Sequence, residues 1–331
     1  MKSHLQRRAA LAALALPLAL SALSCSKSDT FKVTPCDNEG THLIAFSSDR
    51  DHAGQYDIYL YDADVPGFRL LQSLNSATAA DSSPSLSGDG QVIAFVSARG
   101  TTGSDIYVYE RVSCAFVPTG GINSAGDETD PCFTGDTRRL AFVRDTLGHR
   151  RIRLVNGGAL TFVPLPGLDT LAAWDDWSPA PDRTGANMVF VSNRSGEPHL
   201  YIYQRATMSV DTLPEIRTPG VLDLDPALTP DAHWLCFASN GPGRPGYRGG
   251  FDICLFDLTT RQFVALPNLN TAFNERRPSL GAAGTFIAYQ SDSTAGTGHD
   301  VRYYSVASGV VAAPHELANA LDDITPSIRI P

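Results

Sequence analysis

The stretch PSLSGDGQVIAFVSARGTTGSDIYVY, residues 84–109, together with the three residues before it from Asp81, contains the unit from which most of the chain is built. A proline opens a short apolar segment, a turn rich in Gly and Asp follows, and an aromatic residue lies eleven positions after the proline. Five pairs keep this spacing: Pro84 and Phe95, Pro131 and Phe142, Pro179 and Phe190, Pro226 and Phe237, and Pro278 and Tyr289. A fixed internal period of this length indicates a tandem array of one structural unit.

The aromatic anchors of the repeats lie 47 to 52 residues apart: Phe46, Phe95, Phe142, Phe190, Phe237 and Tyr289. Each anchor lies in an apolar segment, and a second alternating run follows it, as in 57–61 and 105–109. Alternation with a period of two predicts strands. The segment opened by the proline and a weaker fourth segment, such as 263–266, bring the number of strands to four per repeat. Four antiparallel strands make one blade, so the sequence predicts an all-β, six-bladed β-propeller.

The last segment, 325–330, predicts how the ring of blades closes. It has the opening proline, Pro326, but the chain stops before any turn or anchor. We expect this orphan first strand to complete the first blade, which would leave no open sheet edge there. Pro35 is the alternative, since it also lies eleven residues before Phe46. It ranks second because Asp37 stands where the other copies place an apolar residue.

The composition indicates a globular chain and excludes one class of partner. The sequence of 331 residues is 43% hydrophobic and 18% charged, with a net charge of -9. Removal of residues 1–24, which carry Lys2, Arg7 and Arg8 and no acid, would leave -9 - 3 = -12. Phosphate backbones would repel such a chain, so we expect no nucleic-acid partner.

Residues 1–24 resemble an export signal, with an apolar run from 9 to 20 after the basic residues. The run is shorter than the roughly 20 residues that a membrane span needs. Residues 22–24 before Cys25 fit a small-x-small cleavage rule and also resemble a bacterial lipobox, so the sequence favours lipidation of Cys25 over simple secretion. The residue after Cys25 is Ser26 and not an aspartate, which resembles the pattern that directs a lipoprotein to the outer membrane. We therefore expect a signal peptide at 1–24, a lipid-anchor tether at 25–40 and a propeller at 41–331.

Five further cysteines lie in a compartment that permits disulfides: Cys36, Cys114, Cys132, Cys236 and Cys254. Cys236 and Cys254 fall on consecutive predicted strands of one blade. A cross-strand bridge between them would need the right register, and two buried thiols are the favoured alternative. No CxxC pair is present, so a structural zinc site is not supported.

Residues 84–90, PSLSGDG, followed by Ile93-Ala94-Phe95 and Asp105-Ile106-Tyr107, resemble the TolB-type propeller repeat, PxWSPDGxxIAF followed by DIY. Residues 226–231 match it closely, and the resemblance extends over 41–330. It implies a cell-envelope propeller, because TolB proteins bind the peptidoglycan-associated lipoprotein and Tol components of the inner membrane. TolB proteins also carry an N-terminal α/β domain, for which the sixteen or so residues after Cys25 leave no room. Similar repeats occur in peptidase accessory propellers and in polysaccharide lyases, so the fold does not give the function.

An acid stands three residues before each opening proline: Asp81, Glu128, Asp176, Asp223, Glu275 and Asp323. If the opening strand is innermost, the six carboxylates surround the mouth of the central channel. They would lie on the face that carries the variable loops between second and third strands, such as 240–248. Two roles are open. They could bind a cation such as Ca²⁺ or a basic partner group, or they could accept hydrogen bonds at the blade junctions.

Two weaker sets of residues suggest other sites. Trp174, Trp177 and the loop around Tyr247 could stack on a sugar ring, although blade packing is the more ordinary role of tryptophan. His149, His199 and His299 fall in one class of loop but in three non-adjacent blades, which weakens a metal or lyase interpretation. No GxSxG, HExxH or P-loop spacing is present.

Together these patterns predict a non-enzymatic lipoprotein that binds an envelope protein through its loop-rich face and acidic channel mouth. We expect no catalytic residue and no cofactor, with Ca²⁺ at the acidic ring as the exception. The alternative is a polysaccharide lyase, hydrolase or glycan-binding propeller that uses the loop histidines and tryptophans. The expected location is the outer membrane, facing the periplasm or the cell surface, or else the periplasm or medium as a soluble protein.

Overall fold

The computed structural model describes residues 40–100, 103–158, 160–168, 173–292, 298–317 and 322–328. All strands of the described residues belong to one compact unit, Phe31–Pro331. The predicted signal peptide and Cys25, with most of the predicted tether, lie outside the described residues. No helix in the described part of the chain has the length and apolar character needed to cross a membrane.

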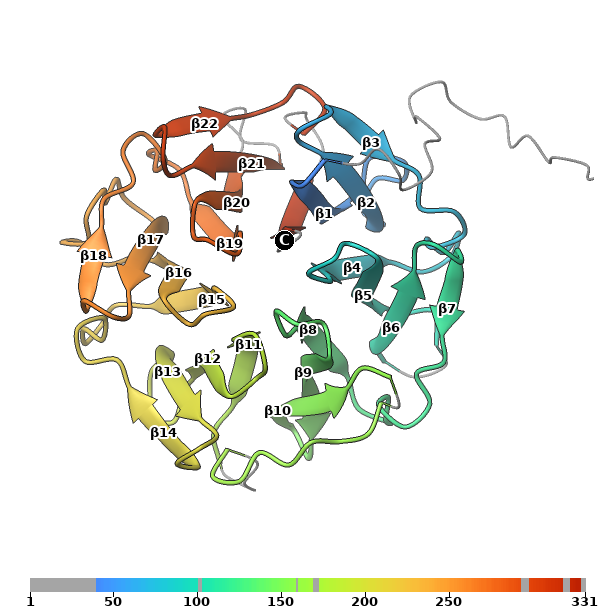
Figure 1. The fold of residues 1–331 in the computed structure, drawn as a ribbon, viewed down its shortest axis with the longest axis horizontal. Helices are drawn as coiled ribbons and strands as arrows, with labels where there is room; N and C mark the ends of the chain where they lie inside the picture. Colours follow the sequence, from blue (N-terminus) through green and yellow to red (C-terminus); the bar gives the residue numbers. More distant parts are fainter. Residues whose placement is uncertain are drawn as a thin grey trace, which may run out of the picture. The chain divides into compact units, whose positions relative to one another are not determined.

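In the described residues, twenty-three strands form six antiparallel sheets, which surround a central axis as the blades of a propeller (Figure 1). Blade 1 contains β1 (Leu43–Ser48), β2 (Asp57–Asp62) and β3 (Gly67–Arg69), together with β23 (Asp323–Ile328) from the C-terminus. Blade 2 contains β4 (Asp81–Leu86), β5 (Val92–Ser97), β6 (Asp105–Glu110) and β7 (Ala115–Val117). Blade 3 contains β8 (Glu128–Phe133), β9 (Arg139–Thr146) and β10 (His149–Asn156).

The remaining three blades each have four strands. Blade 4 contains β11 (Asp176–Pro181), β12 (Asn187–Ser192), β13 (His199–Gln204) and β14 (Ser209–Thr212). Blade 5 contains β15 (Asp223–Leu228), β16 (Trp234–Ser239), β17 (Asp252–Asp257) and β18 (Gln262–Val264). Blade 6 contains β19 (Glu275–Leu280), β20 (Phe286–Asp292), β21 (His299–Ser305) and β22 (Val310–Ala312). The predicted all-β, six-bladed architecture is therefore confirmed.

Closure by the C-terminal strand is also confirmed. β23 pairs with β1 in antiparallel register, with Ile328 opposite Ile44 and Asp323 opposite Ser48. The N-terminal alternative at Pro35 lies outside the described residues. Blade 3 departs from the four-strand pattern, because its fourth segment forms only an isolated bridge between Phe162 and Val155.

The inner strand of every blade has the same β-bulge next to its proline. The residue before the proline has a left-handed backbone with φ between 48° and 53°: Ser83, Asp130, Ser178, Asp225, Arg277 and Thr325. The strand register shifts at each of these positions, as between Ser82 and Ser85. Proline lacks the N–H that a ladder needs, so the bulge accommodates it inside a sheet.

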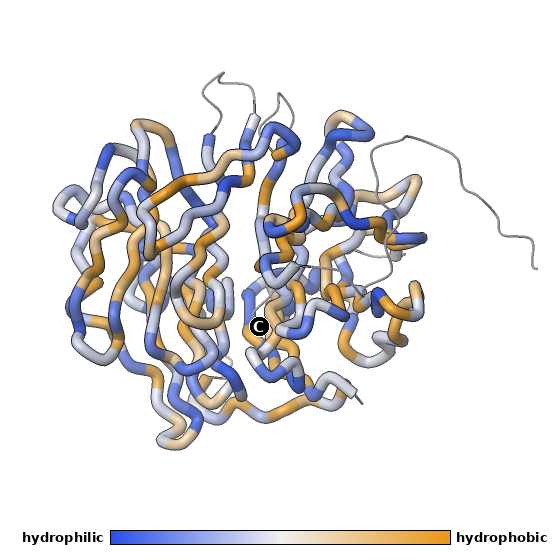
Figure 2. The backbone as a smooth tube through the Cα atoms, turned by 45° about the horizontal axis from the view of Figure 1, so that its top comes forward, coloured by the Kyte–Doolittle hydropathy of each residue, from blue (hydrophilic) through white to orange (hydrophobic). Residues whose placement is uncertain are grey.

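Apolar side chains fill the spaces between neighbouring blades. Between blades 2 and 3, for example, Ile106 and Val108 pack with Phe133 and Phe142. All six aromatic anchors are fully buried, and each stabilises the fold by about 2–3 kcal/mol. Figure 2 shows the apolar stretches along the strands and the hydrophilic residues mainly in the turns.

Serine side chains connect the inner strands of neighbouring blades. Ser85 Oγ accepts a hydrogen bond from the Phe133 N–H of blade 3 at 3.0 Å, and Ser327 Oγ accepts one from the Leu86 N–H at 2.9 Å. At the next junction, between blades 3 and 4, Cys132 takes the place of the serine. On the neighbouring strand, Pro181 takes the place of the residue that donates its N–H. Proline has no N–H to satisfy, so this junction does not need the hydroxyl acceptor.

Candidate functional site

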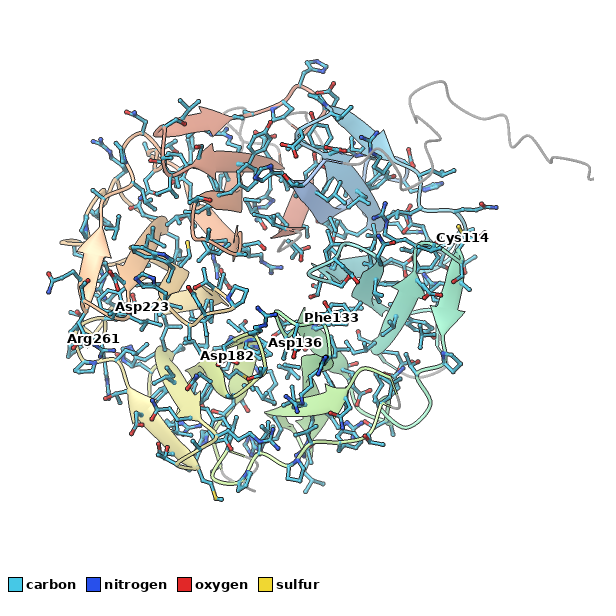
Figure 3. All side chains as sticks on the ribbon, in the orientation of Figure 1. Cys114, Phe133, Asp136, Asp182, Asp223 and Arg261 are labelled. Atoms are coloured by element: carbon cyan, nitrogen blue, oxygen red, sulfur yellow. The ribbon has the colours of Figure 1, made fainter. Side chains whose placement is uncertain are left out.

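The inner strands of all six blades line a cavity of about 420 Å³ around the axis, which we call the central cavity. Each blade contributes its bulge residue, its proline and the residues that follow. Phe133 marks the end of one such strand, near the axis in Figure 3. Because the strands are antiparallel, the face on which the inner strands begin also carries the loops between second and third strands. We call it the mouth face.

Charged side chains of both signs line the central cavity. Arg276 forms an ion pair with Asp225 at 3.1 Å, and its guanidinium lies over the Phe251 ring at 4.5 Å. Across the cavity, Arg150 lies over the Trp177 ring at 4.1 Å. The accessible charge is therefore mixed and includes several arginines, whereas the sequence led us to expect a negative mouth.

Asp130 is the second carboxylate of the central cavity. Its Oδ2 accepts a hydrogen bond from the Ser178 N–H at 3.1 Å. Burial raises the pKa of the Asp130 carboxyl, and the Ser178 hydrogen bond and the positive charges of Arg277 and Arg150 oppose this rise. Arg277 is exposed, and no ion pair joins its guanidinium to a described residue.

A second cavity of about 480 Å³ adjoins the first and shares Arg276 and Arg277 with it. We call it the mouth pocket. Its other lining residues come from blades 5, 6 and 1, with β23 counted in blade 1: Tyr56, Phe251, Asn274, Gln290, Asp292, His299 and Ile324. The pocket therefore depends on ring closure, which brings the two ends of the propeller sequence together.

The six predicted acids begin the six inner strands, but their side chains are buried. Their exposed fractions are 0 to 2%, and none of them lines the central cavity or the mouth pocket. Five pair with an arginine of the same blade: Asp323 with Arg50 at 2.8 Å, Asp81 with Arg99 at 2.6 Å, Glu128 with Arg144 at 2.8 Å, Asp176 with Arg194 at 2.8 Å and Asp223 with Arg244 at 3.2 Å.

Glu275 differs from the other five acids. It accepts hydrogen bonds from the Thr271 hydroxyl at 2.5 Å and the Ser291 hydroxyl at 3.2 Å, and no described arginine pairs with it. Burial raises its pKa, and hydrogen bonds from Thr271 oppose the rise. These contacts support the junction role that the sequence left open. A binding role of the six carboxylates, for Ca²⁺ or a basic group, stays a prediction.

A second buried ring, whose burial the sequence did not predict, lies beside the first. It consists of one residue at or near the start of the third strand of each blade: Asp57, Asp105, Arg151, His199, Asp252 and Asp300. Burial and the negative charge of Asp81 raise the pKa of Asp57 to about 6. Burial and Glu128 likewise raise the pKa of Asp105. The DIY motif was the sequence signal for this ring.

The loop histidines do not converge on one site. His149 lies 3.3 Å from Asp175, while His199 is 3% exposed and its pKa is lowered by burial and by Arg217. Only His299 lines the mouth pocket, with Asp322 at 3.1 Å and Asp292 at 3.4 Å. No group of three or more His, Cys, Asp or Glu side chains that could hold a metal ion occurs in the described part of the chain.

The aromatic candidates are likewise separate. Trp177 lines the central cavity under Arg150, whereas Trp174 lies beneath Arg194 at 5.4 Å and lines neither cavity. Tyr247 is 37% exposed on the mouth-face loop of blade 5, outside both cavities. A glycan site made of all three stays a prediction.

The structure confirms that Cys236 and Cys254 are two buried free thiols. Cys236 lies opposite Leu255 and Cys254 opposite Phe237, so the two cysteines are offset by one residue in register. They therefore point to opposite faces of blade 5, one toward blade 6 and one toward blade 4. Cys132 and Cys114 are also free, with Cys114 at the outer rim of blade 2 (Figure 3). Cys36 lies outside the described residues.

Comparison with known proteins supports the class of fold that this geometry defines. No protein-family profile matches the chain. A TolB homolog of Chlorobium luteolum is 30% identical over 108 residues, which is 33% of this chain and 23% of that protein. The crystal structure of TolB from Acinetobacter baumannii has a TM-score of 0.68 at 17% identity, over 89% of this chain and 68% of that one.

A protein from Agrobacterium tumefaciens assigned as TolB has a TM-score of 0.57 at 14% identity, over 83% of this chain and 89% of its own. The fold thus belongs to the class of closed six-bladed propellers. Within that class, the chain is a TolB-like β-propeller.

Proposed function

We propose that this chain is a non-enzymatic protein-binding module of the cell envelope that engages its partner through the mouth face. The observation that carries the proposal is the mouth pocket, which opens beside the central cavity and combines aromatic, amide and arginine side chains from three blades. Aromatic residues and arginine are the side chains most enriched at protein interfaces. The likeness to TolB propellers supports an envelope location and a protein partner.

The finer part of the proposal concerns anchoring. We propose that Cys25 carries a lipid after removal of residues 1–24, and that residues 25–40 tether the propeller to the outer membrane. The lipobox-like residues before Cys25 and the polar segment after it support this arrangement.

Affinity capture from an envelope extract of the source cell tests the partner proposal. The bait is the tagged full chain, compared with Phe251→Ala on the mouth face and Asp89→Ala in the β4–β5 turn on the opposite face. We expect one envelope protein to be retained by the wild type and by Asp89→Ala and to be lost with Phe251→Ala. Equal retention by both variants, or capture by none, would contradict the proposal, provided that thermal melts show all three chains folded.

A further inference from the structure

Blade 6 breaks the repeat at two positions that both line the mouth pocket. The residue after the aromatic anchor is apolar or small in five blades: Ser47, Val96, Val143, Val191 and Ala238. Blade 6 has Gln290 there. The bulge residue is short in five blades but is Arg277 in blade 6. The other five blades show that the fold does not require these two residues. Their presence at one cavity therefore suggests a role in function.

No hydrogen bond within the described part of the fold engages the Gln290 side chain. The side chain is 8% exposed, and its Oε1 atom is buried without a hydrogen bond. It lies between Arg276 on β19 and Val301 on β21 in the sheet register. A buried amide oxygen without a hydrogen bond is unfavourable, and valine fills the same position in blades 2 to 4. Gln290 therefore lowers stability unless a ligand satisfies it.

Arg277 supplies an unmatched positive charge at the same place. Its N–H donates to Asp225 Oδ2 at 3.3 Å, but no ion pair within the described residues engages its guanidinium. The neighbouring Arg276 is already paired with Asp225. The charge of Arg277 acts on Tyr56 of blade 1 and on Asp130 of blade 3, so it lies where the pocket meets the central cavity.

The remaining charges of the mouth pocket are paired. Asp292 accepts a hydrogen bond from Asn274 Nδ2 at 2.7 Å and faces His299 at 3.4 Å. Tyr56 donates its hydroxyl hydrogen to Asp322 at 2.9 Å. Among the described residues, no ion pair engages the Arg277 guanidinium and no hydrogen bond engages the Gln290 side chain. Phe251 and Ile324 add apolar surface beside these two groups.

We propose that the mouth pocket binds an acidic peptide segment, with a carboxylate on Arg277 and a peptide amide paired with the Gln290 side chain. A guanidinium binds a carboxylate with charge-assisted hydrogen bonds, and the glutamine amide offers the donor and the acceptor that a peptide group needs. This inference rests on the proposed function and names the chemistry of the partner segment.

Isothermal titration calorimetry with a hexaglutamate peptide tests the site on the full chain. A hexaglutamine peptide is the uncharged control ligand, and trigalacturonate is a carboxylate ligand without peptide groups. The variants are Arg277→Gln, Gln290→Val and, as a control on the opposite face, Arg138→Gln in the exposed β8–β9 turn. We expect hexaglutamate to bind about ten-fold more weakly to Arg277→Gln, with binding to Arg138→Gln unchanged.

Gln290→Val separates a ligand role from a structural one. It should weaken hexaglutamate binding while leaving the melting temperature equal or higher, because it removes an unpartnered amide. A lower melting temperature for Gln290→Val, or equal affinity of wild type and Arg277→Gln, would overturn the proposal. Binding of trigalacturonate without binding of hexaglutamate would overturn the peptide assignment. If hexaglutamate fails to bind while an envelope protein is still captured through the mouth face, this inference fails and the proposed function stands.

Discussion

Asp81 and Glu275 occupy the same place in two blades but have different partners. Asp81 pairs with Arg99, whereas Glu275 relies on the hydroxyl groups of Thr271 and Ser291. Removing one member of a buried ion pair leaves the other charge uncompensated, and this costs more than losing a hydrogen bond between neutral groups.

We therefore expect Asp81→Asn to lower the free energy of unfolding by about 3 kcal/mol and Glu275→Gln to lower it by about 1 kcal/mol. Urea denaturation of both variants measures the difference. Added calcium should leave the wild type and both variants unchanged if the carboxylates act only at the junctions. Equal losses in the two variants, or a calcium-dependent rise in wild-type stability, would count against that role.

The raised pKa of Asp57 predicts that the stability of the fold depends on pH. This pKa is raised from 3.8 to about 6, mainly by burial and then by the charge of Asp81. Between these values the folded chain holds a proton that the unfolded chain has released, so stability falls as the pH rises from about 4 to 6. We expect Asp57→Asn to flatten this fall and to raise the free energy of unfolding at pH 7 by roughly 1–2 kcal/mol.

Thermal melts of Asp57→Asn across pH 4 to 7 measure this effect. Asp211→Asn, at an exposed position of β14, is the matched control and should leave the profile of the wild type unchanged. An unchanged profile for Asp57→Asn would show that this carboxyl does not titrate in the window.

The residue contacts were harder to predict from sequence than the strands. The acids and the Ser-x-Arg segments, such as Ser97 and Arg99, are both visible in the repeat. That they meet depends on the ladder, in which Asp81 lies opposite Ser97. Sequence therefore located the acids correctly at the start of each inner strand, whereas their burial followed only from the register and from the arginine on the adjacent loop.

At the scale of elements, β23 closes the ring of blades by completing blade 1. Four of its six residues pair with β1, on either side of the bulge. Ile328 packs in the apolar cluster between blades 6 and 1. A chain that ends at residue 321 would expose the edge of β1 and lose this packing. We expect it to be less stable by several kcal/mol, a large fraction of a typical total.

Urea denaturation compares this truncation with a deletion of residues 31–37, which should cost much less. A synthetic peptide of residues 322–331 added to the truncated chain should restore part of the lost stability. A larger loss from the deletion of 31–37 would transfer the closing role to the segment around Pro35.

The elements were predictable because their signals are local. Proline spacing, aromatic anchors and period-two alternation gave the strands, and their number gave the blades. The bulge beside each proline was not predicted, since a left-handed residue before proline is contrary to its usual local preference. The mouth pocket was not predicted either, because Tyr56, Gln290 and Ile324 meet only after the ring closes.

At the scale of the whole molecule, the proposed lipidation of Cys25 would determine where the propeller resides. If its thiol carries the lipid, Cys25→Ser should move the protein from the detergent phase to the aqueous phase in a phase-partition experiment. A periplasmic protein without a lipid anchor, run in parallel, sets the aqueous reference. Equal partitioning of wild type and variant would exclude the anchor.

The proposed function requires that the mouth face bind a protein partner in the envelope. Photocrosslinking in the living source cell tests it most directly, with a photoreactive amino acid placed either at Phe251 in the mouth pocket or at Asp89 on the opposite face. We expect a discrete crosslinked product with one envelope protein from Phe251 and none from Asp89. The same product from both positions, or none from Phe251 while the protein is folded and exported, would contradict it.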